Sequence, residues 1–211
     1  MAWKSGRGVV ILDQLDWSGR YLEAVGLKLE RRDGAVRLPH EDPERTAEAL
    51  AGAVLALRRR MAIIAENVAN AETARMPGAA EAGAPPQPYR RKVLNIGALG
   101  ALEVAADGSA FRRVYRPAHS EADKDGRVQL PNVYVEVEMA DWRSSAREYE
   151  SLRGALGLVS TRYAAPPAEL LPVPVPPPAY EEKPAIPVPA PAAPEAKPVL
   201  PTPSPVPPKA P

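Results

Sequence analysis

The chain has 211 residues, a formal net charge of +1 and no cysteine. This balanced charge gives no strong attraction to nucleic acid or acidic lipid, and without cysteine there is no disulfide or thiolate chemistry. Aromatic residues make up 5% of the chain, so we expect much of the apolar burial to come from helix–helix contacts or from neighbouring subunits. No run of 18 apolar residues occurs, so no membrane-spanning helix is predicted.

Residues 1–41 are predicted to be an extension that precedes the main domain and has no clear structural pattern. Its apolar run, Gly8–Leu12, is too short for a secretory signal peptide. Further on, apolar spacing indicates a short amphipathic helix, and residues 32–35 have the composition of a turn with an extended segment after it. The apolar positions are Leu12, Leu15, Tyr21, Leu22, Val25 and Leu29.

Residues 43–70 are predicted to form one long amphipathic helix. Asp42 is a favourable N-cap, and Pro43 fits the first helical position, where its missing N–H is not needed. Apolar residues then recur at alternating steps of four and three, a heptad pattern that calls for a partner helix. This stripe consists of Leu50, Val54, Leu57, Met61, Ile64 and Val68. The heptad alone favours an ordinary helical hairpin over an assembly seam.

Residues 71–136 are predicted to form a loop followed by a small antiparallel β region. Strands are expected over residues 89–96, 102–104 and 111–115, with an extended segment over 127–137. Asp107-Gly108-Ser109 is a turn signal, and Asp125-Gly126 predicts a hairpin turn. Pro131 cannot donate to a sheet and therefore predicts an edge position.

Residues 137–163 are predicted to form the second long helix, whose apolar face includes Trp142, Tyr149 and Leu156. The prolines at 166 and 167 end it. Of the 27 prolines, 19 lie from Pro166 onward, so residues 164–211 are predicted to be a disordered, proline-rich tail. The predicted fold is mainly α, with one domain over residues 42–163 in which two terminal helices form a coiled-coil-like pair around a small β insert.

The sequence offers little catalytic chemistry. Only His40 and His119 are of the residue type that could serve as a neutral-pH base, and both are interpreted as surface loop residues. Residues 121–132 imitate part of a calcium loop, but the first ligand is Glu121 and the twelfth position is Asn132 instead of glutamate. We therefore predict no enzyme activity, metal, cofactor or small-molecule substrate.

Two basic runs, Arg58–Arg60 and Arg90–Lys92, are interpreted as ion-pair partners more readily than as phosphate contacts. On the first helix, Arg58 and Arg60 flank the apolar stripe. The acids that we expect to pair with them are Glu138, Glu148 and Glu150 of the second helix. Nucleic acid is accordingly not expected as a partner.

Two motifs resemble those of the bacterial flagellar rod and hook proteins. The first runs from Glu66 to Thr73 and reads N-x-A-N-A-x-T; a tyrosine and basic residues follow downstream. The second runs from Asp125 into the second helix and resembles the FlgC branch of that family, the proximal rod proteins. The motif residues are Asn67, Ala69, Asn70, Tyr89, Arg90, Gly126, Pro131, Asn132, Val133, Glu138 and Met139. Asn67 and Asn70 are expected to cap helix carbonyls, with a left-handed backbone tolerated there.

This resemblance implies a structural subunit of the flagellar basal body, located in the periplasmic rod that carries motor torque to the hook. It implies export through the flagellar type III apparatus and assembly with other rod proteins and with copies of itself through the terminal helices. The alternatives are another rod paralogue, which would share the Asn motif, or a cytosolic coiled-coil adaptor whose proline tail is a ligand for aromatic-grooved domains. The adaptor reading does not explain the Asn motif.

Overall fold

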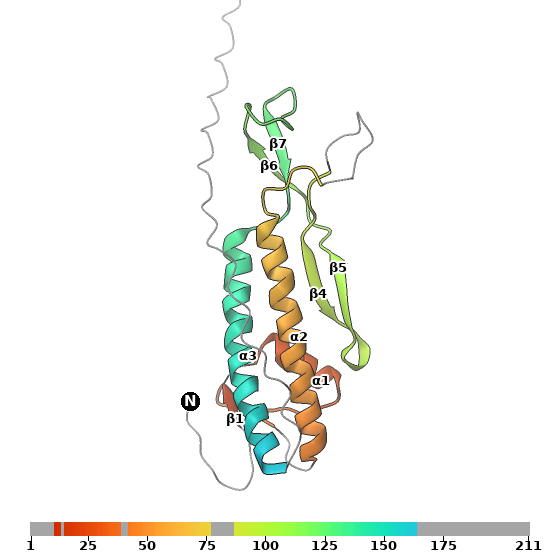
Figure 1. Ribbon diagram of the computed structural model, residues 1–211, viewed down its shortest axis with the longest axis vertical. Helices are drawn as coiled ribbons and strands as arrows, with labels where there is room; N and C mark the ends of the chain where they lie inside the picture. Colours follow the sequence, from red (N-terminus) through yellow and green to blue (C-terminus); the bar gives the residue numbers. More distant parts are fainter. Residues whose placement is uncertain (1–10, 14, 39–41, 77–86, 164–211) are drawn as a thin grey trace, which may run out of the picture.

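The computed structural model describes residues 11–13, 15–38, 42–76 and 87–163 (Figure 1). Three helices and three small antiparallel sheets make up these residues. The helices are α1 (Trp17–Ala24), α2 (Pro43–Ala69) and α3 (Val135–Tyr163), with a short 3-10 turn, η1, at Ala98–Gly100. The strands are β1 (Ile11–Asp13), β2 (Glu30–Arg32), β3 (Ala35–Arg37), β4 (Lys92–Ile96), β5 (Leu102–Ala106), β6 (Arg112–Tyr115) and β7 (Arg127–Leu130). The predicted proline-rich tail lies outside the described residues.

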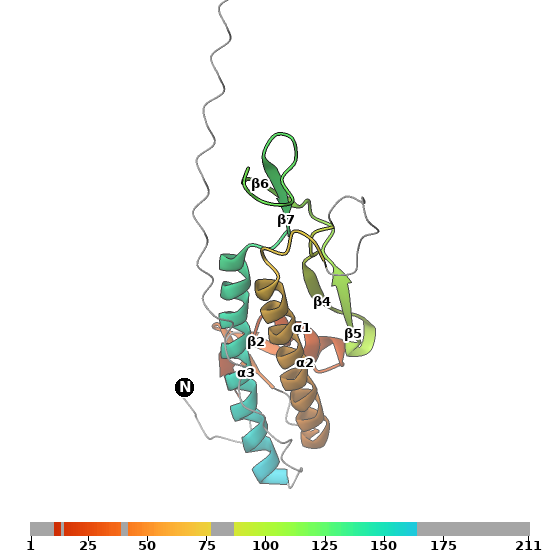
Figure 2. The same ribbon diagram turned by 45° about the horizontal axis from the view of Figure 1, so that its top comes forward.

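Helices α2 and α3 lie side by side and antiparallel along the long axis of the molecule (Figures 1 and 2). The start of α2 is confirmed, because the Asp42 carboxylate accepts the backbone N–H of Arg45 at 3.0 Å. The predicted start of α3 at Val137 is two residues late. Val137 and Glu138 both donate their N–H groups to the carbonyl of Tyr134, so the helix begins at Val135 and the extended segment ends earlier than expected.

The β region forms two separate two-stranded ribbons. Strand β4 pairs with β5 and runs beside α2, whereas β6 pairs with β7 beyond the end of the helix pair (Figure 1). The Asp107–Ser109 turn therefore connects two different sheets and not a hairpin. The predicted turn at Gly126 is confirmed: its φ is +70°, and a side chain there would stand 2.9 Å from the Tyr115 ring.

The extension before α2 is better ordered than its sequence suggested. The predicted helix is confirmed but shorter, because Gly26 ends α1 in a left-handed conformation with the Leu27 N–H bonded to the Leu22 carbonyl at 2.9 Å. The predicted turn lies at Asp33-Gly34, between β2 and β3. Strand β1 completes this sheet by pairing with β3.

All nine stripe residues are buried within the chain itself. On α2 they are Leu50, Val54, Leu57, Met61, Ile64 and Val68, and on α3 they are Trp142, Tyr149 and Leu156. Most belong to one core cluster that also contains Leu15, Leu22 and Val36 of the N-terminal segment. The apolar stripes of both helices are thus buried within a single chain, and a role for these residues between subunits stays a prediction. No helix among the described residues is long and apolar enough to cross a bilayer.

Candidate functional site

Asn67, in the last turn of α2, is the centre of a buried polar cluster. Its side chain is 1% exposed and makes four hydrogen bonds. The amide group donates to the Lys92 carbonyl at 2.9 Å and to a Glu138 oxygen at 3.0 Å. The amide oxygen accepts the Lys92 N–H and the Tyr89 hydroxyl, each at 2.9 Å. Since an asparagine side chain offers two donors and two acceptor lone pairs, its hydrogen-bonding capacity is filled.

Asn67 therefore does not cap its own helix, contrary to the sequence prediction. It instead joins α2 to the backbone of β4 and to α3. Asn70 does cap a carbonyl, donating to that of Glu66 at 2.9 Å. The backbone of Asn70 has a φ of −105°, so the left-handed conformation that asparagine tolerates is not adopted at this helix end.

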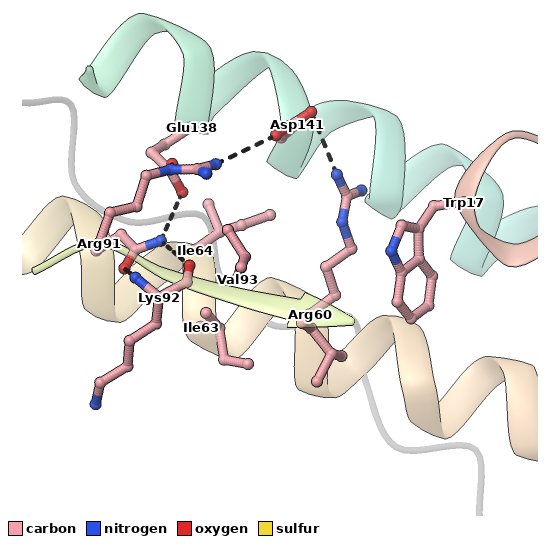
Figure 3. Close-up of a pocket in the computed structure, with 11 residues that line it drawn as sticks. Trp17, Arg60, Ile63, Ile64, Arg91, Lys92, Val93, Glu138 and Asp141 are labelled. Atoms are coloured by element: carbon pink, nitrogen blue, oxygen red, sulfur yellow. Dashed lines mark hydrogen bonds and ion pairs between the residues drawn. The ribbon is translucent and has the colours of Figure 1, made fainter. Parts of the chain in front are cut away.

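Glu138 and Arg91 supply the charged part of the cluster (Figure 3). The Glu138 carboxylate comes from the first turns of α3, is fully buried, and accepts both the Asn67 amide and the Arg91 Nε–H. Arg91 also contacts Asp107 at 3.2 Å and Asp141 at 3.9 Å. A buried carboxylate is tolerated because it is paired and hydrogen-bonded in this way.

Asn132 links the same cluster to the loop after β5. Its side-chain oxygen accepts the Arg91 N–H at 2.9 Å, and its amide donates to the Ser109 hydroxyl at 2.8 Å. Arg90 donates to the carbonyls of Asp107 and Ser109 and stacks on the Phe111 ring, 4.1 Å from its centroid. Both asparagines thus act as crosslinks between backbone segments that are far apart in the chain.

The environment shifts several pKa values in the direction that preserves these contacts. Burial, followed by the charges of Glu66 and Glu138, raises the pKa of Tyr89 well above 10.0 and keeps its hydroxyl protonated. The backbone N–H of Ser109 is the main cause of the lowered pKa of Asp107, with help from Arg91. Burial alone lowers the pKa of Arg91, but its bonds to Glu138 and Asp107 outweigh this and raise it.

A cavity of about 190 Å³ lies beside the cluster, between α2, α3 and β4. Figure 3 shows Arg60 and Arg91 approaching Asp141 from two sides, and Ile63 and Ile64 of α2 also line the cavity. Trp17 closes one end, and the guanidinium of Arg60 lies 5.6 Å from the centroid of its ring. Through Asp141 these charged groups join α2, α3 and the residue before β4.

The remaining motif residues are divided between buried and exposed positions. Val133 packs with Tyr89 and Ala71 in a small apolar cluster, and the Pro131 carbonyl accepts the Arg112 Nε–H at 3.0 Å. Ala69 is exposed and Met139 is half-buried. The motifs are therefore brought together only in part, around Asn67.

The predicted ion pairs across the helix pair are right in kind but wrong in their partners. Arg60 pairs with Asp141 at 3.3 Å and with the Ser145 hydroxyl. Of the acids expected to face Arg58 and Arg60, Glu138 holds Arg91, Glu148 accepts the Ser18 N–H, and Glu150 pairs with Arg153. Glu121, from the calcium-like segment, is engaged by Arg75 at 2.7 Å.

Three curated proteins have sequences similar to this chain. The flagellar basal-body rod protein FlgC of Agrobacterium fabrum is 34% identical over 122 residues, which are 52% of this chain and 83% of the relative. FlgC of Bacillus subtilis is 32% identical over 123 residues, covering 48% and 80%. FlgC of Salmonella typhimurium is 33% identical over 113 residues, covering 48% and 79%.

This chain belongs to the FlgC family of flagellar basal-body rod proteins. No model of a known protein family matches it. About half of the chain lies outside the similarity to the FlgC relatives.

Sequence reasoning missed two features of this FlgC-family chain. Asp107 and Ser109 were assigned only to a turn, although their carbonyls hold Arg90 and Asn132. Glu148 was assigned to the wrong partner. No local signal points to this role of Glu148. Asp16 stands at the N-cap position of α1 and would be expected to cap that helix, but its side chain makes no cap hydrogen bond and Glu148 accepts the N–H groups instead.

Proposed function

We propose that this chain is a structural, non-catalytic subunit of the proximal rod of the bacterial flagellar basal body. The observation that carries this proposal is the buried polar cluster around Asn67, which we call the joint. Residues of both family motifs meet in it: Asn67 and Tyr89 from the first, and Glu138 from the second. Membership of the FlgC family supports the same assignment, since the relatives are rod proteins by name. The subunit accordingly acts in the periplasmic rod, where shape and stiffness matter more than bond chemistry.

The joint suits a part that transmits torque. A side chain whose hydrogen bonds are all internal holds its neighbours in one geometry, and a buried ion pair resists separation. Asn67, Arg91 and Glu138 together tie the ends of α2 and α3 to the start of β4. Load applied to either helix is then passed to the β4–β5 ribbon instead of bending the pair.

For assembly, we propose that residues 42–163 act as the rod-type domain and that α2 and α3 form a coiled-coil-like pair. The nine buried stripe residues would contribute by keeping this pair in shape. Contacts with copies of the chain and with other rod proteins would use the outer faces, where Leu55 is 59% and Val137 is 55% exposed. Export through the flagellar type III apparatus, and a spacer or contact role for the proline-rich residues 164–211, belong to the same proposal.

The primary test is to isolate hook–basal bodies from the source bacterium and immunoblot them for this chain. We expect it in the rod fraction, and we expect its deletion to abolish swimming without slowing growth. Finding the chain only in cytosolic complexes would contradict the assignment and favour an adaptor.

A surface variant separates assembly from folding. Leu57 is fully buried, so Leu57→Asp would report on folding alone. Leu55→Asp instead places a charge on the exposed face of α2; we expect a normally folded chain that fails to support swimming. Glu48→Lys, at another exposed position of α2, controls for altered charge. Normal swimming of the Leu55→Asp strain would argue against the outer face of α2 as an assembly surface.

A further inference from the structure

The β6–β7 ribbon stands beyond the end of the helix pair at which α2 ends and α3 begins (Figures 1 and 2). Its buried side consists of Val128 and Leu130, which pack with Ala74 of the loop after α2. Among the described residues, none from α1, α2 or α3 belongs to this small apolar cluster. The apolar side of the ribbon therefore rests on the loop at residues 71–76 and not on the main core.

Glu72, in the same loop, binds two arginines of the ribbon. Its carboxylate accepts a hydrogen bond from Arg112 at 3.4 Å and another from Arg116. Arg112 also donates to the carbonyls of Ala71 and Pro131, each at 3.0 Å. The three charged side chains are only 16% to 26% exposed, so solvent and salt screen their attraction in part. Arg112 thus joins the loop after α2 to the segment before α3.

The charged contacts surround the apolar one. Arg112, Val114 and Arg116 occupy alternate positions along β6 and the residue after it, which places their side chains on one side. Val114, between the two arginines, packs against the apolar cluster. Further along the ribbon, Arg75 of the loop donates two hydrogen bonds to Glu121, at 2.7 and 2.8 Å. A small apolar contact alone tolerates rotation, whereas hydrogen bonds to charged groups require particular directions.

We propose that Glu72 is the positioning residue of the β6–β7 ribbon: its carboxylate sets the angle at which this ribbon stands against the helix pair. Glu72 occupies the second open position of the motif N-x-A-N-A-x-T. Five residues after Asn67, which ties the first ribbon to the helices, it does the same for the second ribbon. This inference goes beyond the proposed rod function, because it concerns the geometry within one subunit.

The test measures the distance between the ribbon and α2 in the purified full-length chain. The chain has no cysteine, so two introduced cysteines can be spin-labelled selectively. The label sites are Lys124→Cys, between β6 and β7, and Ala62→Cys on α2, both at exposed positions. Double electron–electron resonance then gives the distribution of distances between the two labels. We expect one narrow distance in the labelled chain that carries no further substitution.

Glu72→Gln keeps the size of the side chain and removes its charge. We expect the fraction of chains outside the narrow distance to rise roughly tenfold, the factor that corresponds to the loss of one hydrogen bond to a charged group. The matched control is Glu66→Gln, near the same end of α2, where the carboxylate pairs with Lys92 of β4 and not with the ribbon. We expect this control to keep the narrow distance.

An unchanged distribution in Glu72→Gln would overturn the inference, and so would equal broadening in Glu66→Gln. A second pair of variants compares the two sides of the same strand. Arg116→Gln should broaden the distribution, and Arg113→Gln, at an exposed position on the other side, should not; equal effects would contradict the role of Glu72. If Glu72→Gln does not fold, this second pair decides. Basal-body immunoblots test the rod assignment separately.

Discussion

The α2–α3 pair is held by polar contacts at one end and by apolar contacts at the other. Where α2 ends and α3 begins, Asn67, Arg91 and Glu138 form a buried hydrogen-bonded joint with β4. Toward the start of α2 and the end of α3, Leu50 and Leu156 pack in the core beneath α1. Both contacts exclude water, yet they constrain the helices in different ways.

The two kinds of contact differ in how strictly they fix the geometry of the groups that they join. Apolar packing is roughly proportional to buried area and tolerates small shifts, whereas hydrogen bonds and ion pairs require particular distances and angles. We therefore expect the apolar end to contribute stability in proportion to its buried area, and the polar end to determine how the β4–β5 ribbon is set against the helices. Four substitutions test this division, in decreasing order of expected effect.

The largest loss is expected for Glu138→Ala, which leaves Arg91 and the Asn67 amide without their buried acceptor. Breaking a buried ion pair by removing one partner lowers the free energy of unfolding by about 4 kcal/mol. Urea unfolding measures this, with the exposed Glu136→Ala on the same helix as control. A loss below about 1 kcal/mol would mean that the joint adds little to stability.

Leu57→Ala tests the apolar packing at the middle of α2. Leu57 is fully buried, and truncation of a buried leucine lowers the free energy of unfolding by about 3 kcal/mol through lost burial and a residual cavity. Leu55→Ala, at the exposed neighbouring position, is expected to change it by less than about 0.5 kcal/mol. Equal effects from the two variants in thermal unfolding would argue against the described orientation of α2.

Asn67→Ala is expected to cost about 2 kcal/mol, because the Tyr89 hydroxyl and the Lys92 backbone lose a buried partner. Beyond stability, we expect faster hydrogen exchange in β4 and β5 while the centre of α2 stays protected. Asn95→Ala, an exposed position on β4, serves as control. Uniform loosening of the whole chain would show that the joint has no special role in placing the ribbon.

Tyr89→Phe should have the smallest effect, about 1 kcal/mol for one hydrogen bond. The pH dependence of the free energy of unfolding gives a sharper test of the same contact. The pKa of Tyr89 is raised above 10.0 in the folded chain, so the unfolded chain loses this proton first. The folded state therefore loses stability as pH rises above about 10. Tyr89→Phe should remove this decrease of the free energy of unfolding with pH. The control Tyr134→Phe, at a 57% exposed position, should keep it. A parent chain whose free energy of unfolding stays constant up to pH 11 would contradict the burial of the Tyr89 hydroxyl.

Much of the fold was predictable from local patterns. The heptad spacing and the Asp42-Pro43 start located α2, since periodicity and capping act within a few residues. The same holds for the turn at Gly126, where only a residue without a side chain fits beside Tyr115. Ion pairing between the helices was predictable as a class, although Asp141 and not the expected glutamates pairs with Arg60.

The role of Asn67 and the docking of the N-terminal segment were decided by tertiary structure alone. In sequence, Asn67 looks like a helix cap, but its partners are 22 to 71 residues away. Ser18 and Glu148 are 130 residues apart. Periodicity predicts which face of a helix is apolar and does not say what covers it. Which segment covers that face depends on long-range packing, and here the chain's own N-terminal segment packs onto α2 and α3.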